Sequence, residues 1–233
     1  MSSLKSPWNK GRSVGQRLAF TPYQIRAIDE YLSCEGLLHD RCLFMVATDS
    51  FLRCGDLLNL QVRDLQTSTG LARESFPWRQ QKTNTNVVPV LTQKTRQACL
   101  DWIAYSQKQP HHYLFTRNKA IDAASISATC YRRLIKRWAE YIDLEGEQYS
   151  THSLRRSKPT WLYEQGVSVE DISQLLGHQS TEATLRYLGL TLAKAQAEAL
   201  KRDIFVRDRP HRSLSRKSSK SLTKTRKRVD NDD

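Results

Sequence analysis

Apolar residues recur at helical spacing over most of the chain. Ile25, Ile28 and Leu32 share one helix face behind a start signal, in which Thr21 caps the helix and Pro22 suits its first turn. The same spacing, with capping residues and terminal glycines, predicts further helices over about 40–51, 92–106, 126–142, 150–166, 168–177 and 191–202, and a short one begun by Ser180 or Thr181. The pattern therefore indicates a mostly helical protein.

A different pattern interrupts the helices between Gly70 and Leu91. The β-branched segment 87–90 follows the polar turn 83–86, which predicts a β-hairpin, and Pro89 suits an edge strand. We therefore expect an α+β fold, mainly α with a small antiparallel β-sheet. The expected organisation is an irregular N-terminal arm over 1–20, one folded domain over 21–206, and a basic disordered tail over 207–233.

Net charge narrows the choice of partner. The formal charge is +13, with ten Lys/Arg against four Asp/Glu in the tail and an excess of +7 over the remaining 206 residues. A basic body favours nucleic acid first and an anionic membrane second, although charge runs are often only solvated faces. No segment joins a large apolar face to a basic one, so we expect no membrane partner.

The remaining composition is that of a cytoplasmic globular protein. Hydrophobic residues make up 39% of the chain, no apolar run could span a bilayer, and the N-terminus has no apolar signal region. The five cysteines are odd in number, widely spaced and without a C-x-x-C pair, which favours reduced, buried thiols over metal ligands.

Several polar residues are candidates for chemistry. His152 and Arg155 lie three apart at a predicted helix start, so both can face one point where partial positive charge favours a phosphate. Each candidate alone has an ordinary explanation as a capping, core or solvated side chain. The full set, in chain order, is Arg53, Lys82, His152, Arg155, His178 and Tyr187.

In their order and surroundings, these residues resemble the tyrosine recombinase (phage integrase) family. The matching stretches are DSFLRCGDLLNLQVRDL around Arg53, QQKTNTNVVPV around Lys82, THSLRRS with His152 and Arg155, LLGH ending at His178, and TEATLRYLG around Tyr187. All six positions carry the expected residue type, and the resemblance spans about residues 20–205. It implies the catalytic-domain fold of that family over residues 21–206.

The resemblance also implies a reaction. The protein would be a site-specific DNA recombinase or integrase that cleaves and rejoins strands through a 3′-phosphotyrosyl intermediate, with Tyr187 as nucleophile. Arg53, Arg155 and His178 would stabilise the non-bridging oxygens, and their cationic cluster is expected to favour the Tyr187 phenolate. Lys82 would protonate the leaving 5′ oxygen, and His152 would accept the tyrosine proton or orient the site.

Partners follow from the same resemblance. We expect double-stranded DNA as the partner, self-association into a synaptic tetramer on that DNA, and DNA-bending accessory proteins as further candidates. The expected location is the cytoplasm of a bacterium, with the DNA-bound protein on the nucleoid. No ATP or divalent metal is expected, because the phosphotyrosyl bond stores the energy of the cleaved one. Candidate phosphate contacts are Arg132, Arg133, Lys136, Arg137, Arg156 and Lys158.

The chain departs from the family pattern in two places. Pro159, preceded by Lys158, falls inside the predicted helix of Arg155 and is expected to kink it. Only about 20 residues precede Thr21, whereas most relatives carry a core-binding domain there, so the chain resembles the short, catalytic-domain-only members. The segment 191–205 is expected to contact a neighbouring subunit or to fold back on its own domain.

Two other functions stay open from sequence. A type IB topoisomerase-like enzyme would use the same residues to nick and reseal one strand without exchange. A non-catalytic DNA-binding accessory or regulatory protein on the same fold would form no covalent complex with DNA.

Overall fold

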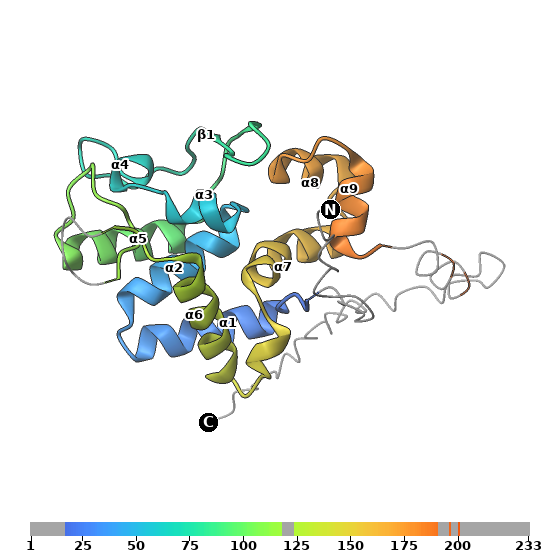
Figure 1. The fold of residues 1–233 in the computed structure, drawn as a ribbon, viewed down its shortest axis with the longest axis horizontal. Helices are drawn as coiled ribbons and strands as arrows, with labels where there is room; N and C mark the ends of the chain where they lie inside the picture. The colour runs from blue at the N-terminus through green and yellow to red at the C-terminus, as the bar shows by residue number, and fades with distance from the viewer. Residues whose placement is uncertain (1–16, 118–123, 191–195, 197–199, 201–233) are drawn as a thin grey trace, which may run out of the picture. The chain divides into compact units, whose positions relative to one another are not determined.

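The computed structural model describes residues 17–117, 124–190, 196 and 200. Its elements lie in one compact unit, Met1–Thr191, and Figure 1 shows their arrangement. They are α1 (Pro22–Cys34), α2 (Leu38–Asp49), α3 (Cys54–Leu58), α4 (Val62–Leu65), β1 (Trp78–Arg79), β2 (Asn86–Val87), α5 (Gln93–Ser106), α6 (Ala128–Glu140), the 3-10 helix η1 (Gly146–Gln148), α7 (Thr151–Glu164), α8 (Val169–Leu176) and α9 (Thr181–Leu188). The expected α+β class, mainly α with a small antiparallel sheet, is confirmed.

The central helix is α2. All residues from Cys42 to Asp49 are buried, and the helix packs against α1, α5 and α7. Its last residue, Asp49, accepts hydrogen bonds from Lys158 Nζ at 2.6 Å and from Thr95 Oγ1 at 2.6 Å. One buried carboxylate therefore joins α7 and α5 to the end of α2, and Lys158 serves this ion pair rather than solvent.

A second, smaller hydrophobic cluster lies beside the main core. It consists of Phe51, Ile172, Leu176 and Leu188, with half-buried residues including Tyr187 packed against it. These residues come from α8, α9 and the turn after α2, so the cluster attaches the last two helices to the centre of the fold. The candidate site residues gather where this cluster meets the main core.

The turn after α2 differs from the predicted helix over 40–51. The helix begins earlier, at Leu38, and ends at Asp49, because Phe51 adopts a left-handed backbone conformation with φ of 55°. Such a conformation is rare for a bulky residue and needs support from the surrounding structure. Here burial of the Phe51 ring supplies that support.

The predicted hairpin is present and short. Strands β1 and β2 pair through Trp78↔Val87 and Arg79↔Asn86 only, and Pro89 lies outside both strands. Asp56 at α3 holds the hairpin, since its Oδ1 accepts from Trp78 Nε1 at 3.2 Å and from the Gln81 amide at 2.9 Å. The hairpin is therefore fixed to the helix that follows Arg53.

Most of the other predicted helices agree with the structure at their starts. Thr92 caps α5, as predicted. Ser127 caps α6, whose first residue, Ala128, lies two residues after the predicted beginning at 126. Helix α7 continues past Pro159 to Glu164. Phe20, assigned from sequence to the irregular arm, is buried and stacks on Tyr149 at 4.1 Å between ring centroids.

Some sequence expectations fall on residues that the structure leaves undescribed. These are the first 16 residues of the arm, the tail over 207–233, and the predicted helix over 191–202 except for Gln196 and Leu200. Within the described ranges, no helix is both long and apolar enough to cross a membrane.

Two glycines provide a matched test of packing behind the site. Gly177, at φ 64°, ends α8, and a Cβ there would lie 2.6 Å from Val87 Cγ1; Gly166, at φ 90°, ends α7 with open space around it. We expect Gly166→Ala to lower the free energy of unfolding by about 1 kcal/mol through backbone strain alone. Gly177→Ala should lower the free energy of unfolding by about 1–3 kcal/mol more than Gly166→Ala does, because the added methyl group also displaces the hairpin. Urea denaturation of both variants checks this, and equal losses would contradict the close packing.

Candidate active site

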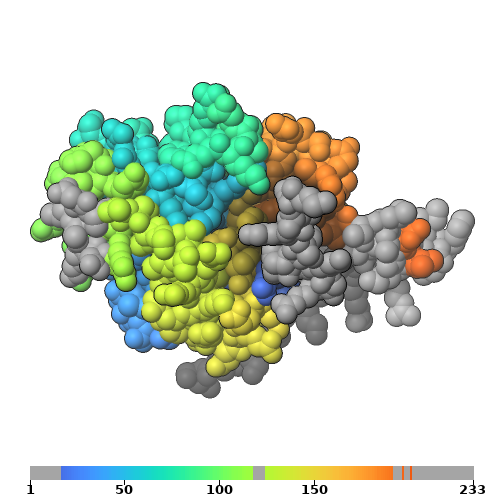
Figure 2. Space-filling model, in the orientation of Figure 1, coloured from blue at the N-terminus to red at the C-terminus, as the bar shows by residue number. Residues whose placement is uncertain are grey.

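The six sequence candidates come from five different segments that converge on one region. Arg53 caps the start of α3, Lys82 lies in the turn between β1 and β2, and His178 follows Gly177 at the end of α8. His152 and Arg155 belong to the first turns of α7, and Tyr187 to α9. On the face visible in Figure 2 the hairpin adjoins α8, as the contacts between α8 and β2 require.

Arg155 is the most buried of the set, with 5% of its surface exposed. Its Nε donates to the Phe51 carbonyl at 2.6 Å, and its Nη2 donates to the Leu176 carbonyl at 3.1 Å. Burial lowers the pKa of the guanidinium from its usual value, and the two carbonyl dipoles partly replace the lost water. The remaining N–H groups are available to an anion.

Arg53 is held by a buried amide. Its Nη1 donates to Gln80 Oε1, and a longer contact of 3.5 Å reaches Thr83 Oγ1 in the hairpin turn. Gln80 is 1% exposed, and its Nε2 donates to the Leu176 carbonyl at 3.0 Å, the same oxygen that Arg155 uses. The two arginines are thus linked through one glutamine and one carbonyl.

His178 and Tyr187 form the other side of the cluster. Their rings meet edge to face, with centroids 5.3 Å apart and planes at 81°. The guanidinium carbon of Arg155 lies 5.6 Å from the centre of the Tyr187 ring. His178 Nδ1 is 2.9 Å from the hydroxyl of the buried Thr184, which belongs to α9 as Tyr187 does.

Both histidines are kept neutral near pH 7. Partial burial and the charges of Arg155 and Arg53 lower the pKa of His178 from 6.5 to about 4. The pKa of His152 is lowered by the same causes, with Lys82 among the neighbouring charges. Lys82 itself is exposed at the hairpin turn. A neutral imidazole can accept a proton on its unprotonated nitrogen, and the neighbouring cations make it a weaker base.

Tyr187 differs from the sequence expectation of a stabilised phenolate. Burial raises the pKa of its hydroxyl to about 12, although Arg155, Arg156 and Arg53 act in the opposite direction. Loss of hydration around the phenolate outweighs the attraction of the cations. The side chain is therefore a neutral phenol in the structure without DNA, and its activation needs a proton acceptor.

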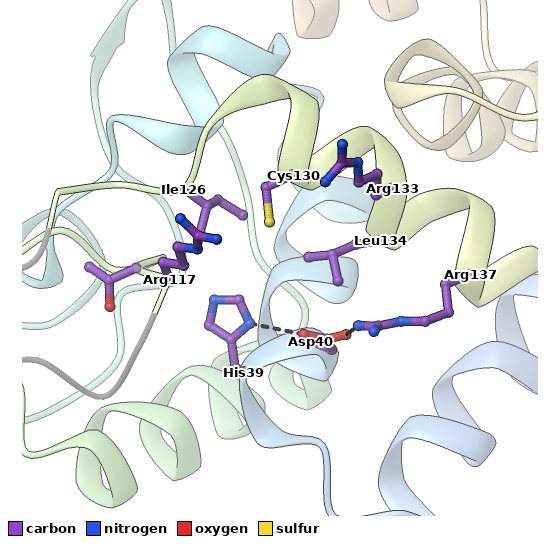
Figure 3. Close-up of a pocket in the computed structure, with 9 residues that line it drawn as sticks. His39, Asp40, Arg117, Ile126, Cys130, Arg133, Leu134 and Arg137 are labelled. Carbon is purple, nitrogen blue, oxygen red and sulfur yellow. Dashed lines mark hydrogen bonds and ion pairs between the residues drawn. The ribbon is translucent and has the colours of Figure 1, made fainter.

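Basic residues of α6 differ in how much they are engaged within the protein. Arg137 Nη2 lies 3.3 Å from Asp40 Oδ2 and Lys136 pairs with Glu147. Figure 3 shows Arg137 reaching Asp40, with His39 on the other oxygen of the same carboxylate. The pocket there has a volume of about 370 Å³, and none of its lining residues belongs to the six candidates. Among the residues that the structure describes, neither Arg132 nor Arg133 forms an ion pair, and both stay candidates for phosphate binding.

Three residues of the site were not singled out from sequence. Gln80 and Thr184 hold Arg53 and His178, and Asp56 anchors the hairpin. Their types are common on protein surfaces, and only Asp56, three residues after Arg53 in a short apolar helix, has a suggestive position. Among the described side chains, no group of His, Cys, Asp or Glu could hold a metal ion.

Comparison with known proteins agrees with this geometry. A model of the phage integrase family matches residues 20–196. The chain is 27% identical over 199 residues to putative integrase/recombinase y4rF of Sinorhizobium fredii, covering 84% of this chain and 46% of that protein. It is 26% identical over 208 residues to tyrosine recombinase XerC of Natranaerobius thermophilus, covering 79% and 66%. The matched part of this chain thus spans slightly less than half of the first relative and about two thirds of the second.

Solved structures show the same fold. The XerA recombinase has a TM-score of 0.64 and 17% identity, with 80% of this chain and 65% of that one covered. XerH bound to its difH substrate has a TM-score of 0.61 and 16% identity, with 79% and 55% covered. A lambda integrase dimer bound to a core site has a TM-score of 0.54 and 17% identity, with 76% and 61% covered.

The lowered pKa of His178 has a consequence for stability. The unfolded chain takes up a proton on this imidazole below about pH 6.5, whereas the folded protein does so only near pH 4. We therefore expect the free energy of unfolding to fall as the pH is lowered through this window. His178→Gln should give a shallower fall in chemical denaturation measured from pH 7 to pH 4. An unchanged slope would show that His178 is not held neutral by the fold.

Proposed function

The chain belongs to the phage integrase family, and on this premise we propose that it is a site-specific DNA recombinase with Tyr187 as its nucleophile. The observation that carries the proposal is the packing of Tyr187 against His178 and Arg155, two groups suited to a phosphate. The tyrosine would attack a phosphodiester and form a 3′-phosphotyrosyl bond with DNA.

The arginines would bind the phosphate under attack. Arg155 uses two N–H groups on backbone carbonyls and keeps others for the non-bridging oxygens. Arg53 would bind the same phosphate from the hairpin side. Both sit where a buried positive charge gains most from an anion, because the low dielectric of the site strengthens their attraction.

His178 would donate to the phosphate through a defined tautomer. Its neutral ring can donate from Nε2 only if Nδ1 accepts the hydroxyl proton of Thr184, which lies 2.9 Å away. In this arrangement Thr184 orients the ring and selects the proton-bearing nitrogen. His178, whose pKa is about 4, can therefore be neutral and still donate a hydrogen bond from Nε2 to the phosphate.

Proton transfers would complete the cleavage step. Tyr187, with a pKa of about 12, must lose its proton as the O–P bond forms, and the neutral His152 is the candidate acceptor. The bond from phosphorus to the 5′ oxygen then breaks, and Lys82 would give that oxygen a proton. The exposed position of Lys82 on the hairpin turn lets it approach DNA.

The second half of the reaction would reverse the first on another strand. A 5′ hydroxyl of a partner strand attacks the phosphotyrosyl bond and releases Tyr187, so that one phosphodiester replaces another without ATP. We propose that the reaction also needs no divalent metal. A synaptic tetramer on double-stranded DNA would bring the two strands together, and DNA-bending accessory proteins are further candidate partners.

The nucleophile is tested with a nicked suicide substrate, which traps the covalent complex. We expect Tyr187→Phe to abolish attachment to DNA, since it removes the attacking oxygen, and to leave DNA affinity within about twofold. Attachment is followed by denaturing gel electrophoresis in buffer containing EDTA, with Tyr163→Phe on the far part of α7 as the control.

Covalent attachment by Tyr187→Phe would refute the assignment, and loss of attachment by wild type in EDTA would refute the metal-free reaction. If wild type forms no complex under any condition, a non-catalytic DNA-binding protein is the better explanation. Recombinant product from two marked DNA sites distinguishes strand exchange from nicking and resealing in place.

The general acid is tested through the leaving group. Lys82→Ala should slow cleavage of normal DNA by about 10²–10⁴-fold, the usual contribution of acid–base catalysis. A substrate with sulfur in place of the 5′ bridging oxygen should restore most of this rate, because a thiolate leaves without a proton. Arg53→Ala serves as the comparison, since it should stay slow on both substrates. Equal losses for Lys82→Ala on both substrates would exclude Lys82 as the acid.

A further inference from the structure

We propose that Gln80 is a positioning residue for strand cleavage, which holds Arg53 and Arg155 in one arrangement toward the same phosphate. This inference rests on the proposed function. Gln80 touches neither the nucleophile nor the expected path of the leaving group, so it would act through the groups that it binds.

The side-chain amide of Gln80 makes three hydrogen bonds in the described structure. Its Oε1 accepts from Arg53 Nη1 and from Thr83 Oγ1, the latter at 2.9 Å. Its Nε2 donates to the Leu176 carbonyl at 3.0 Å. Because arginine only donates and a carbonyl only accepts, these partners determine which end of the amide faces which way.

The contact with Leu176 connects two parts of the site. The Leu176 carbonyl also accepts from Arg155 Nη2 at 3.1 Å, and Leu176 lies two residues before His178. A shift of the Gln80 amide therefore disturbs Arg53 directly and the position of Arg155 through the shared oxygen. Misplacement of about 1 Å at such groups can cost about 10²-fold in rate.

The packing around Gln80 leaves little room for another arrangement. The residue is 1% exposed, and a Cβ at Gly177 would lie 3.0 Å from its Nε2. Glycine at 177 thus allows the end of α8 to approach the amide closely. Water cannot replace the glutamine without a cavity, so removal of the amide would leave the Leu176 carbonyl with one donor fewer.

Gln80 also shapes the turn that carries Lys82. Its backbone amide donates to the Thr85 carbonyl at 2.9 Å, and its carbonyl accepts from the Asn84 amide at 2.8 Å. These bonds persist in any non-proline variant. Substitutions at Gln80 consequently test the side chain and leave the turn of the proposed general acid in place.

The decisive variant is Gln80→Met, which keeps the side chain's length and removes its hydrogen bonds. We expect the single-turnover rate of covalent attachment to a nicked suicide substrate to fall about 10–100-fold, as for loss of a hydrogen bond to a charged group. DNA affinity should change less than threefold. The matched control is Gln81→Met, the exposed neighbour on the same hairpin, which should attach within twofold of wild type.

A double-mutant cycle separates positioning from a general structural effect. In an Arg53→Lys background, which keeps a charge but loses the planar fork, Gln80→Met should slow attachment by a smaller factor than in the wild-type background, because only its effect on Arg155 through the Leu176 carbonyl remains. An equal loss in both backgrounds, or attachment by Gln80→Met at the wild-type rate, would overturn the proposal while leaving the nucleophile assignment intact. Failure of wild type to attach would overturn the proposed function and this inference with it.

A second variant covers the case in which Gln80→Met does not fold. Gln80→Glu keeps size and polarity and can accept from Arg53, but its carboxylate cannot donate to the Leu176 carbonyl. We expect it to fold with a lowered melting temperature, because a carboxylate oxygen would face the Leu176 carbonyl, and to attach at least tenfold more slowly. Attachment by Gln80→Glu within twofold of wild type would overturn the proposal. If neither variant folds, the proposal is also overturned, because Gln80 then has a purely structural role.

Discussion

The buried guanidinium of Arg155 is the group on which the arrangement of the site depends. A permanent charge that is 5% exposed needs dipoles in place of water, and the carbonyls of Phe51 and Leu176 provide them. Both carbonyls lie at places where a helix ends. Phe51 takes a left-handed conformation just after α2, and Gly177 does so just after Leu176. The charge and these two chain turns therefore support one another, at the junction of the two hydrophobic clusters.

The same burial explains the protonation states around Arg155. Partial burial and positive charge keep His178 neutral, the neighbouring charges also lower the pKa of the more exposed His152, and burial keeps Tyr187 a phenol. The cluster without DNA therefore holds cations and neutral groups with few anions to balance them. A phosphodiester would supply the missing negative charge and bring the scissile bond beside the tyrosine. We infer that such a site is prepared for its substrate electrostatically, at a cost in stability that the surrounding packing offsets.

Sequence patterns located the helices and the hairpin well and were poorest at the turns. Capping at Thr92 and the terminal glycines marked real helix ends because these signals act over a few residues. The end of α2 was predicted too late, since the left-handed conformation of Phe51 accompanies burial of its ring and a carbonyl that accepts from Arg155, 104 residues further along the chain. The cations do lower the pKa of Tyr187, as expected, but burial outweighs them in the structure without DNA, because residue types reveal nearby charges but not how completely water is excluded.

What the sequence alone determined is the set of chemical groups and their order: two arginines, a lysine, two histidines and a tyrosine, within the patterns of an identifiable family. Only the tertiary structure decided which neutral residues hold them. Gln80 and Gln81 are adjacent and identical in type, yet one is buried between Arg53 and Leu176 and the other faces solvent. The reason is physical. Side-chain chemistry is a property of each residue, whereas burial and hydrogen-bond partners come from segments brought together by folding.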